Sequence, residues 1–430
     1  MRILVITDVL WRNDNGVGNS YSNIFTDMPE VEIANICCQE GTSYNTVSKK
    51  CFQISEGILI RNLRNKANPA GKIEARREQY DESNNNESNF MRALRRSRLQ
   101  VLFWARNCIW KVGRWKSPEL RAFVDEFSPD LVFAQLQDKM YLNSLAAYVA
   151  DYTNKPLVVY AWDDVYSLKQ FSLSPLWWID RLFQRRSIRN LIRRCSILYT
   201  ISNEQKEEYH KTLGVRTELL YKGKFFDKKP EIESEANPIQ MIYTGNLYSG
   251  RFGTIASLCE ELDQINKNGK KIELQIYSGT DLTENQKNQL NKYEGVYFNG
   301  KVTESEVERL QNKADVLLHI EPFSLKGSLL CRLSFSTKLV DYFYKGKCIF
   351  AVGSSRCSAM KYLERNDAAI IATSLEDAKK NLVNLSTQPE LMKVYATKAW
   401  ECGYKNHQIE LIQNGVIKDF RSLINEGATD

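Results

Sequence analysis

The sequence has few histidines, and it contains no pair of cysteines spaced as Cys-x-x-Cys. Histidine occurs three times and cysteine ten times. Zinc sites and redox motifs use closely spaced cysteines and histidines, and disulfide frameworks are typical of short secreted chains. We therefore expect reduced, mostly buried thiols, no metal site and no disulfide framework.

Long hydrophobic runs are also absent. No stretch of about 18 uncharged apolar residues occurs, so the sequence predicts no membrane-spanning helix. The first residues offer only a short apolar run at 3–6 between Arg2 and Asp8, without the long apolar stretch of a signal peptide. These absences favour a cytoplasmic protein.

A strong excess of one charge is missing as well. The 59 Lys and Arg against 52 Asp and Glu leave a net charge of +7, which is weak for 430 residues. The sequence contains no RNA-binding motif, so no nucleic-acid partner is expected. Hydrophobic residues make up 43% and charged residues 26%, the composition of a globular protein with ordinary cores.

The chain is long enough for two domains built from alternating strands and helices, because one ordinary domain takes roughly 150 residues. Apolar runs rich in β-branched residues, with segments of helical periodicity between them, indicate parallel α/β sheets. These runs lie at 2–10, 31–38, 130–136, 156–162 and 196–202, and then at 239–245, 271–279, 295–302, 315–320 and 348–353. A polar, proline-containing stretch at 227–238 is the expected linker between two α/β domains.

The segment SFSTKLVDYFYKGKCIFAVG, residues 334–353, carries the clearest chemical signal. Ser336 is expected as the N-cap of a helix, so that unpaired backbone N–H groups and the helix dipole form an anion site. Lys338 adds a full charge, and Asp341 can accept hydrogen bonds from ribose hydroxyls. Gly346 suits the end of the helix. A capped helix with an exposed lysine and aspartate is the alternative interpretation.

The same segment resembles the Ser-x-Lys-Leu-x-Glu/Asp-Tyr…Gly-Lys-Pro-Val segment of nucleotide-sugar-dependent GT-B glycosyltransferases, in particular glycosyltransferase family 4-like enzymes. Tyr243-Thr-Gly-Asn-Leu followed by Arg251 is similar to that family's Gly-Arg-Leu…Lys-Gly loop, and ISNEQKEEYHKTLGV at 201–215 to its Ser-rich turn and helix. VYFNGKVTESEVERLQNKADVLLHI is similar to its strand, helix and following strand. The resemblance is strongest over 239–353.

The resemblance implies a division of the chain into two Rossmann-like domains whose parallel sheets face each other across a cleft. Residues 1–230 would form an acceptor-binding domain and residues 239–400 a domain that binds the nucleotide sugar. Residues 401–430 would form a helical region that packs back on the first domain.

The resemblance also implies donor-binding residues. The family places two cations on the donor diphosphate; Asn246 stands at the first position and Arg251 at the second, so Arg251 and Lys338 become the expected diphosphate-binding cations. A solvated loop arginine is the alternative for Arg251. The full expected donor set is Gly16, Gly18, Gly245, Asn246, Tyr277, Ser278, Gly279, Ser336, Thr337, Lys338, Leu339 and Asp341.

Family members often carry a Glu-x7-Glu pair in this region. Asp341 occupies the place of the second acid, but Leu333 stands in place of the first. A shortened acid would therefore hold the ribose, while recognition of the sugar hydroxyls is altered. Glu321, at the end of a strand, is a looser candidate facing the cleft.

In the first half, two features are similar to family elements near the acceptor. The loop containing Gly16 and Gly18 would let the backbone approach the donor phosphate, although a tight turn with positive φ explains a Gly-x-Gly pattern equally well. Asp163 and Asp164 follow an apolar strand, where ligands of parallel sheets bind. We expect Asp163 to meet the acceptor or the reacting sugar, with Asp164 second; capping of the next helix is the alternative for Asp164.

Two basic segments interleaved with aromatic residues, at 91–120 and 175–195, concentrate the positive charge. Tryptophan beside arginine suits an anionic membrane surface or single-stranded nucleic acid. Helices with an apolar core stripe and solvated arginines are the alternative interpretation. Given the resemblance, docking on a membrane surface near a lipid-linked acceptor is favoured.

The function implied is transfer of a sugar from a nucleotide sugar to the hydroxyl of a saccharide or lipid-linked acceptor, with retention of configuration and without a metal or other cofactor. Asp163, Asp164, Arg251 and Lys338 are the expected catalytic residues. The family's usual employment implies assembly of cell-surface polysaccharide or glycolipid. The alternatives are a nucleotide-sugar epimerase of the same fold and a non-catalytic, membrane-docking partner of a glycosyltransferase.

Overall fold

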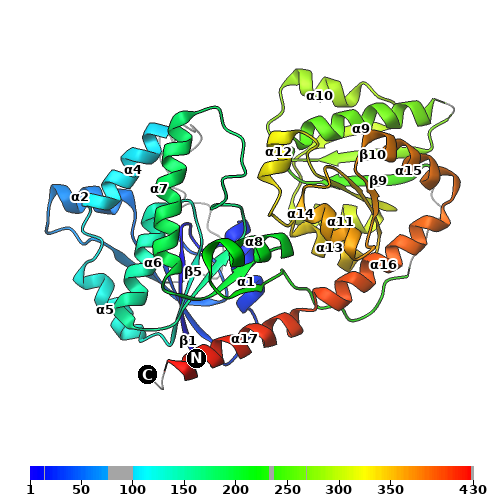
Figure 1. Cartoon of the computed structure of the whole chain (residues 1–430). Coiled ribbons are helices and arrows are strands. Elements are labelled where there is room, and N and C mark those ends of the chain that lie inside the picture. The colour runs from blue at the N-terminus through cyan, green and yellow to red at the C-terminus, as the bar shows by residue number, and fades with distance from the viewer. Residues whose placement is uncertain (14, 76–99, 232–236, 268, 428–430) are drawn as a thin grey trace.

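The computed structural model describes residues 1–13, 15–75, 100–231, 237–267 and 269–427. They form two α/β domains that lie side by side (Figure 1). Each domain is built on one sheet, and the expected α/β class with two parallel-sheet domains is confirmed.

The first domain contains an eight-stranded sheet in the order β4-β3-β2-β1-β5-β6-β7-β8. All neighbouring strands are parallel except β3 and β4. The strands are β1 (Arg2–Thr7), β2 (Glu32–Cys37), β3 (Ser48–Gln53), β4 (Lys72–Ala75), β5 (Leu131–Gln135), β6 (Leu157–Ala161), β7 (Cys195–Thr200) and β8 (Thr217–Leu219).

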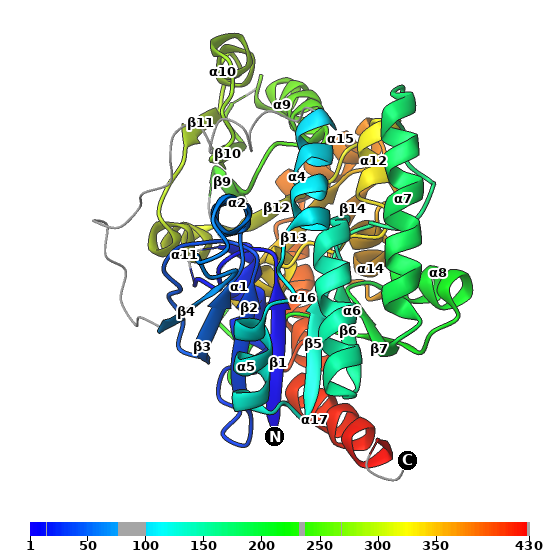
Figure 2. The same ribbon diagram turned by 90° about the vertical axis from the view of Figure 1, so that its left-hand side faces the viewer.

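Helices cover both faces of this sheet (Figure 2). Side chains of β1 alternate between two cores: Leu4 and Ile6 pack under α5, α6 and α7, whereas Ile3 and Val5 pack against α1 and α17. Burial on both faces explains the continuous apolar runs of the central strands. The helices of this domain are α1 (Gly16–Phe25), α2 (Glu56–Arg64), α4 (Gln100–Val112), α5 (Pro118–Phe127), α6 (Met140–Thr153), α7 (Pro175–Ile192) and α8 (Asn203–Leu213).

The second domain contains a six-stranded parallel sheet in the order β11-β10-β9-β12-β13-β14. Its strands are β9 (Ile239–Thr244), β10 (Ile272–Tyr277), β11 (Val296–Gly300), β12 (Val316–Ile320), β13 (Cys348–Val352) and β14 (Ile370–Ala372). Its helices are α9 (Arg251–Asn266), α10 (Glu284–Asn291), α11 (Glu304–Lys313), α12 (Leu325–Leu330), α13 (Lys338–Lys345), α14 (Ser358–Arg365), α15 (Leu375–Thr387) and α16 (Glu390–Asn406).

The chain crosses between the domains twice, and the two crossing segments run side by side. Lys224 donates its backbone N–H to the carbonyl of His407 at 2.9 Å, and Ile409 donates to the carbonyl of Lys224 at 3.0 Å. Beyond this crossing, α17 (Ile409–Glu426) returns to the first domain, where Val416 and Phe420 are buried in its core (Figure 1).

His407 lies at the centre of the crossing and is fully buried. Its Nδ1 lies 3.0 Å from the carbonyl oxygen of Lys222, and its Nε2 lies 2.9 Å from the hydroxyl of Tyr362. Burial lowers the pKa of His407 to about 4, so the imidazole is neutral and structural at ordinary pH.

The ten cysteines are all free, and eight of them are buried. The expectation of mostly buried thiols is confirmed. Among the described residues, no helix combines the length and the apolar character needed to cross a bilayer.

Candidate functional site

The candidate donor site lies at the carboxyl edge of the second sheet, where β9 ends and the loop to α9 begins. Gly245 donates its N–H to the carbonyl of Tyr277 at 3.0 Å, so the ends of β9 and β10 are tied together. The hydroxyl of Tyr243 donates to the carbonyl of Asn246 at 2.6 Å and closes the loop. This edge is where ligands bind in open parallel sheets.

Lys338, the first residue of α13, reaches this loop and donates to the carbonyl of Thr244 at 3.1 Å. A Cβ atom on Gly245 would lie only 2.3 Å from the Lys338 Nζ, so the close approach of the ammonium group requires glycine at this position. Burial, followed by the nearby charge of Arg251, lowers the pKa of Lys338 to about 8. An ammonium group held beside a second cation in a largely enclosed place is suited to an anionic ligand.

Arg251, the first residue of α9, lies beside Lys338 and is held by the end of β12. Its Nε donates to the carbonyl of Ile320 at 3.0 Å, and a terminal nitrogen lies 2.9 Å from a carboxylate oxygen of Glu321. Burial opposes ionisation of Glu321, but His319 and Arg251 outweigh it and lower the pKa of that carboxyl. Glu321 is therefore the buried partner that orients Arg251.

Asp341 lies one turn after Lys338, but its carboxylate is occupied by lysines of the crossing segment. Lys222 Nζ donates to both carboxylate oxygens at 3.0 and 2.9 Å, and Lys224 Nζ lies 3.2 Å away. The predicted hydrogen bonds from ribose hydroxyls to the Asp341 carboxylate therefore require the carboxylate to share or exchange these lysine partners.

The start of α13 corrects one expectation. Ser336 was expected as the N-cap, but the helix begins at Lys338, Thr337 occupies the cap position, and no side chain caps it. The Leu339 N–H bonds to the Ser336 carbonyl at 3.0 Å, so a tight turn takes over part of the role of a cap. Leu339 itself is buried in the domain core, whereas Gly346 ends the helix in the left-handed conformation, as predicted.

The loop after β10 borders the same edge. Tyr277 is partly buried, and Ser278 is buried with its hydroxyl accepting the N–H of Thr280 at 3.1 Å. Gly279 has room for a side chain, because the nearest atom to an added Cβ lies 3.6 Å away. The structure therefore brings Tyr277 next to Gly245, and the donor role of the loop remains a prediction.

In the first domain, Asp163 and Asp164 follow β6 and have different environments. Asp163 is exposed and accepts a hydrogen bond from the Ser334 hydroxyl of the second domain at 2.9 Å. Asp164 is buried and accepts the N–H of Ser167 at 2.8 Å. Its second oxygen lies 3.3 Å from Arg332, so Asp164 has the partners of a structural group. Asp163 alone remains available to an acceptor.

The segment that contains Arg332 ties the second domain to the first. Arg332 binds Glu208 through two nitrogens, at 2.6 and 3.0 Å. Leu333 is fully buried within the hydrophobic core of the first domain, and its carbonyl accepts the hydroxyl of Ser202 at 2.7 Å. Leu333, which stands where the resembled family often has its first acid, therefore serves as an apolar contact between domains.

Gly16 and Gly18 open α1, and neither has a positive φ. The alternative interpretation, a tight turn with positive φ, is therefore wrong, and approach of this loop to the donor phosphate stays a prediction. A Cβ on Gly18 would lie 2.1 Å from the carbonyl oxygen of Arg12, so the glycine permits close packing of the helix start on this loop. Asn15 caps the helix by accepting the Gly18 N–H at 2.7 Å.

An ion cluster at the carboxyl edge of the first sheet was not predicted. Asp8, which directly follows β1, is buried and bonds to both Lys139 and Tyr141, and Arg106 lies 3.6 Å from it. Arg106 also bonds to Glu56. Burial opposes ionisation of Asp8, but Lys139 and Arg106 outweigh it and lower the pKa of the carboxyl. The sequence signal that could have indicated this cluster is the carboxylate of Asp8 directly after an apolar strand.

The basic aromatic segment at 91–120 is described only from residue 100 onward; its residues 91–99, with Arg92, Arg95, Arg96 and Arg98, lie outside the described residues. Trp110 and Trp115 are buried, and the Trp110 ring stacks on Tyr141 at 4.5 Å. For these two tryptophans the membrane interpretation is wrong, because they fill the core of the first domain.

In the described ranges, no three or more His, Cys, Asp or Glu side chains are grouped so that they could hold a metal ion. The described site combines the cations Lys338 and Arg251, the carboxylates Glu321 and Asp341, and the exposed Asp163.

No family model and no curated protein matches the chain. Among solved structures, the chain is similar to Anabaena HepE in complex with UDP, with 15% identity, 98% of this chain and 100% of that chain covered, and a TM-score of 0.63. It is also similar to sucrose-phosphate synthase from Thermosynechococcus elongatus, with 10% identity, 99% and 100% covered, and a TM-score of 0.62.

A third similar structure is α,α-trehalose-phosphate synthase from Burkholderia xenovorans in complex with glucose-6-phosphate. The identity is 10%, the coverage 97% and 100%, and the TM-score 0.59. These neighbours are GT-B glycosyltransferases, and the similarity extends over nearly the whole chain. The protein therefore has the GT-B fold.

Proposed function

We propose that the protein is a glycosyltransferase that moves a sugar from a nucleotide sugar to an acceptor hydroxyl. The observation that carries this proposal is the pairing of Lys338 and Arg251 at the carboxyl edge of the second sheet. Each cation is held by backbone or carboxylate oxygens, and their mutual repulsion favours an anion such as a diphosphate. The UDP complexes of GT-B neighbours support a nucleotide-sugar donor.

In the proposed reaction, the bond between the anomeric carbon and the β-phosphate oxygen breaks, and a bond to the acceptor oxygen forms. The acceptor proton passes to a phosphate oxygen of the leaving group, on the same face of the sugar, so configuration is retained. Lys338 and Arg251 stabilise the negative charge that develops on the diphosphate. Asp163 would orient the acceptor hydroxyl from the first domain.

We further propose that residues 1–230 bind the acceptor and residues 239–400 the donor, as in glycosyltransferase family 4-like enzymes. The acceptor would be a saccharide or lipid-linked saccharide in cell-surface polysaccharide or glycolipid assembly. The protein would then act in the cytoplasm at the inner face of the membrane.

The first experiment is a thermal-shift screen with UDP-, GDP-, ADP- and dTDP-sugars, followed by calorimetry on the nucleotide that stabilises the protein. Arg251→Gln is expected to weaken donor binding by roughly 10- to 150-fold, the loss of a charge-assisted interaction of about 1.5–3 kcal/mol. Arg421→Gln is the matched control, because Arg421 is an exposed residue of α17 whose ion pair in the described part of the chain is with Glu30.

Three outcomes would contradict the proposal. If no nucleotide sugar stabilises the protein, the second domain has no donor site. Binding without transfer or hydrolysis would favour the non-catalytic partner. Conversion of the donor sugar to its epimer, without an acceptor, would favour the epimerase.

Transfer is expected to be independent of divalent metal, because two fixed cations take the role that a metal has in other glycosyl transfers. Activity after EDTA treatment should equal that of the untreated protein. Loss of activity in EDTA and recovery with magnesium or manganese would show that Lys338 and Arg251 are insufficient.

A further inference from the structure

The outward face of α7 changes from apolar to basic along the helix. At about 100° per residue, its exposed residues fall within one stripe of somewhat less than half the circumference, opposite the buried Ile188 and Leu191. In chain order this stripe contains Leu176, Ile179, Leu182, Phe183, Arg186, Arg189, Asn190 and Arg193. The first four are apolar, and three of the last four are cationic.

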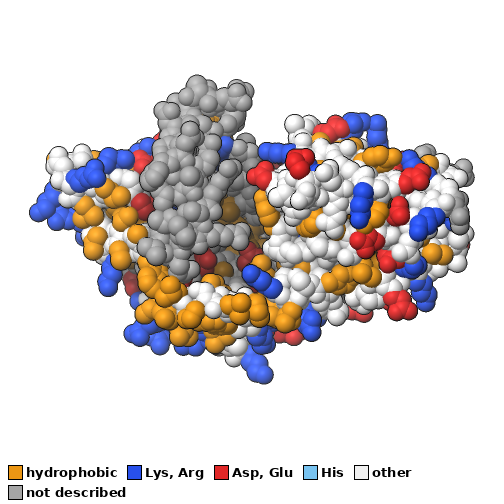
Figure 3. Space-filling view, turned by 90° about the horizontal axis from the view of Figure 1, so that it is seen from above, with side chains coloured by type: hydrophobic (Ala, Val, Ile, Leu, Met, Phe, Trp, Pro, Cys, Tyr) orange, Lys and Arg blue, Asp and Glu red, His pale blue; other side chains and the backbone are white. Residues whose placement is uncertain are grey.

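The apolar half of this stripe continues into the loop that precedes the helix. Leu182 and Phe183 are 59% and 57% exposed, and Leu173 in the loop is 88% exposed. Leu168 and Phe171 are exposed in the same loop. The loop and the start of α7 stand at the upper end of the first domain in Figure 1. Figure 3 looks down on this end and shows hydrophobic side chains gathered over part of the first domain.

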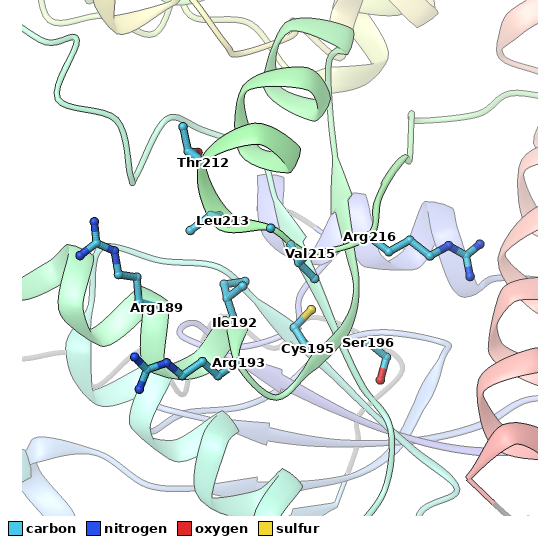
Figure 4. A pocket seen from close by; sticks show the side chains of 10 residues that line it. Arg189, Ile192, Arg193, Cys195, Ser196, Thr212, Leu213, Val215 and Arg216 are labelled. Carbon is cyan, nitrogen blue, oxygen red and sulfur yellow. The ribbon is translucent and has the colours of Figure 1, made fainter.

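The basic half of the stripe forms an open groove. A groove of about 410 Å³ is lined by Arg186, Arg189, Asn190 and Arg193. It adjoins a pocket of about 520 Å³ that Arg189 and Arg193 share with the end of α8. Figure 4 shows the side chains of Arg189 and Arg193 extending to the same side, whereas Arg216 extends to the opposite side.

The cations of this groove lack acidic partners in the described part of the chain. No Asp or Glu there lies within salt-bridge distance of Arg186, Arg189 or Arg193. By contrast, Arg194 pairs with Asp151 and Arg216 with Asp419. The groove is therefore complementary to an anionic partner.

We propose that the outward face of α7 docks on an anionic lipid bilayer. The apolar half, with Leu173, Leu182 and Phe183, enters the boundary of the acyl region, and the arginines of the other half bind lipid phosphates. Because the polarity changes along the helix and not around it, α7 meets the membrane at a tilt, with its N-terminal end deeper. From its interior outward, a bilayer presents first apolar chains and then phosphates, which matches the order of apolar and basic residues along α7. The inference rests on the proposed function only for the reason to dock, which is access to a lipid-linked acceptor; the docking surface itself is argued from α7.

The test is flotation of the full chain with vesicles of phosphatidylcholine, with and without phosphatidylglycerol. The wild-type protein is expected to float with the anionic vesicles. Arg186→Gln/Arg193→Gln should weaken this binding by roughly 25-fold, since each arginine near an anionic surface contributes about fivefold. Leu182→Ser/Phe183→Ser should weaken binding at low and high salt alike. The exposed Leu411→Ser and Arg421→Gln on α17 are the matched controls, with no expected change.

Several outcomes would overturn the docking surface. Unchanged flotation of both double variants would show that another surface binds the membrane. If inorganic phosphate raises the melting temperature of the protein but the protein does not float with vesicles, the groove is a site for small anions and not for a membrane. If the wild-type protein is a dimer that does not float, and Leu182→Ser/Phe183→Ser converts it to a monomer, the α7 face is a contact between two copies of the chain.

Donor binding in the same variants separates this inference from the proposed function. Calorimetry should give unchanged nucleotide-sugar affinity in both double variants, because the α7 stripe belongs to the first domain, whereas Lys338 and Arg251 begin helices of the second. A wild-type protein that binds and transfers sugar to a soluble acceptor, yet does not float, would overturn the docking surface alone.

Discussion

Replacing Lys338 with methionine is expected to abolish most donor affinity while making the free protein more stable. The ammonium group is largely surrounded by protein atoms and lies beside Arg251, which together lower its pKa from 10.5 to about 8. In the unfolded chain the lysine keeps its ordinary pKa, so the folded state incurs a cost of about 3 kcal/mol below pH 8. Loss of the hydrogen bond to Thr244 offsets about 1 kcal/mol of this gain.

The pH dependence follows from the same shift. Between pH 8 and 10.5 the unfolded chain binds more protons at Lys338 than the folded chain, so the cost of burying the charge disappears as the pH rises. The stabilisation of Lys338→Met, about 2 kcal/mol near pH 7, should therefore shrink above pH 8. Donor affinity of the wild-type protein should fall above pH 8 as the ammonium group loses its proton.

These expectations can be measured by urea unfolding and by calorimetry with the donor between pH 6.5 and 9.5. Lys338→Met should weaken donor binding by roughly 10- to 150-fold at pH 7, and Lys338→Arg should retain binding with a flatter pH profile. Lys418→Met, at an exposed position of α17, is the control for the loss of a lysine. Unchanged donor affinity in Lys338→Met would remove this residue from the donor site.

Leu333→Glu, which restores the acid common in the resembled family, is expected to destabilise the protein instead of improving catalysis. Leu333 is fully buried in the core of the first domain although it belongs to the second. A glutamate there would lose the apolar contact and bury a carboxylate in a hydrophobic core. The expected cost is about 4 kcal/mol or more.

The protein can avoid part of this cost by withdrawing the segment from the first domain. That movement would break the pairing of Arg332 with Glu208 and Asp164 and the hydrogen bond from Ser334 to Asp163. We therefore expect lower stability in urea together with a larger radius of gyration in solution scattering. Transfer should fall because Asp163 is no longer held against the second domain.

Leu333→Met is the matched control, because it conserves volume and should cost less than about 1.5 kcal/mol. A Leu333→Glu variant with unchanged stability and increased transfer would show that residue 333 faces the sugar and not the first domain.

Much of the fold follows from local patterns. The central strands β1, β5, β6, β9, β12 and β13 coincide with the predicted apolar runs because both of their faces are buried. The strands that were not predicted are short or lie toward sheet edges. β3 contains two consecutive exposed lysines, Lys49 and Lys50, and β8 and β14 have only three residues each, too few for a periodic signal.

The sequence allowed some residues of the candidate site to be named, but it did not show which residues would contact one another there. A helix capped at its C-terminal end by Gly346 was expected from its spacing, although with Ser336 as the N-cap, and α13 begins instead at Lys338. Arg251 was expected from a family resemblance. Nothing in the local pattern indicated that Glu321 would hold Arg251, or that Lys222 and Lys224 would occupy Asp341. These partners are separated by 70 and about 120 residues in the chain. Hydrophobic periodicity predicts helices and strands from neighbouring residues, so it does not predict pairings over such separations.

The sequence by itself therefore determined the α/β class, the two domains and the position of the cationic helix, because burial on both strand faces and helix end signals act between neighbouring residues. Only the tertiary structure decided that Leu333 packs in the other domain and that Trp110 and Trp115 are core residues. It also decided that Arg186, Arg189 and Arg193 stand without acidic partners in the described chain, whereas Arg181 of the same helix pairs with Asp164. Those properties depend on contacts between segments that are far apart in the sequence, and tertiary packing determines which of these segments come together.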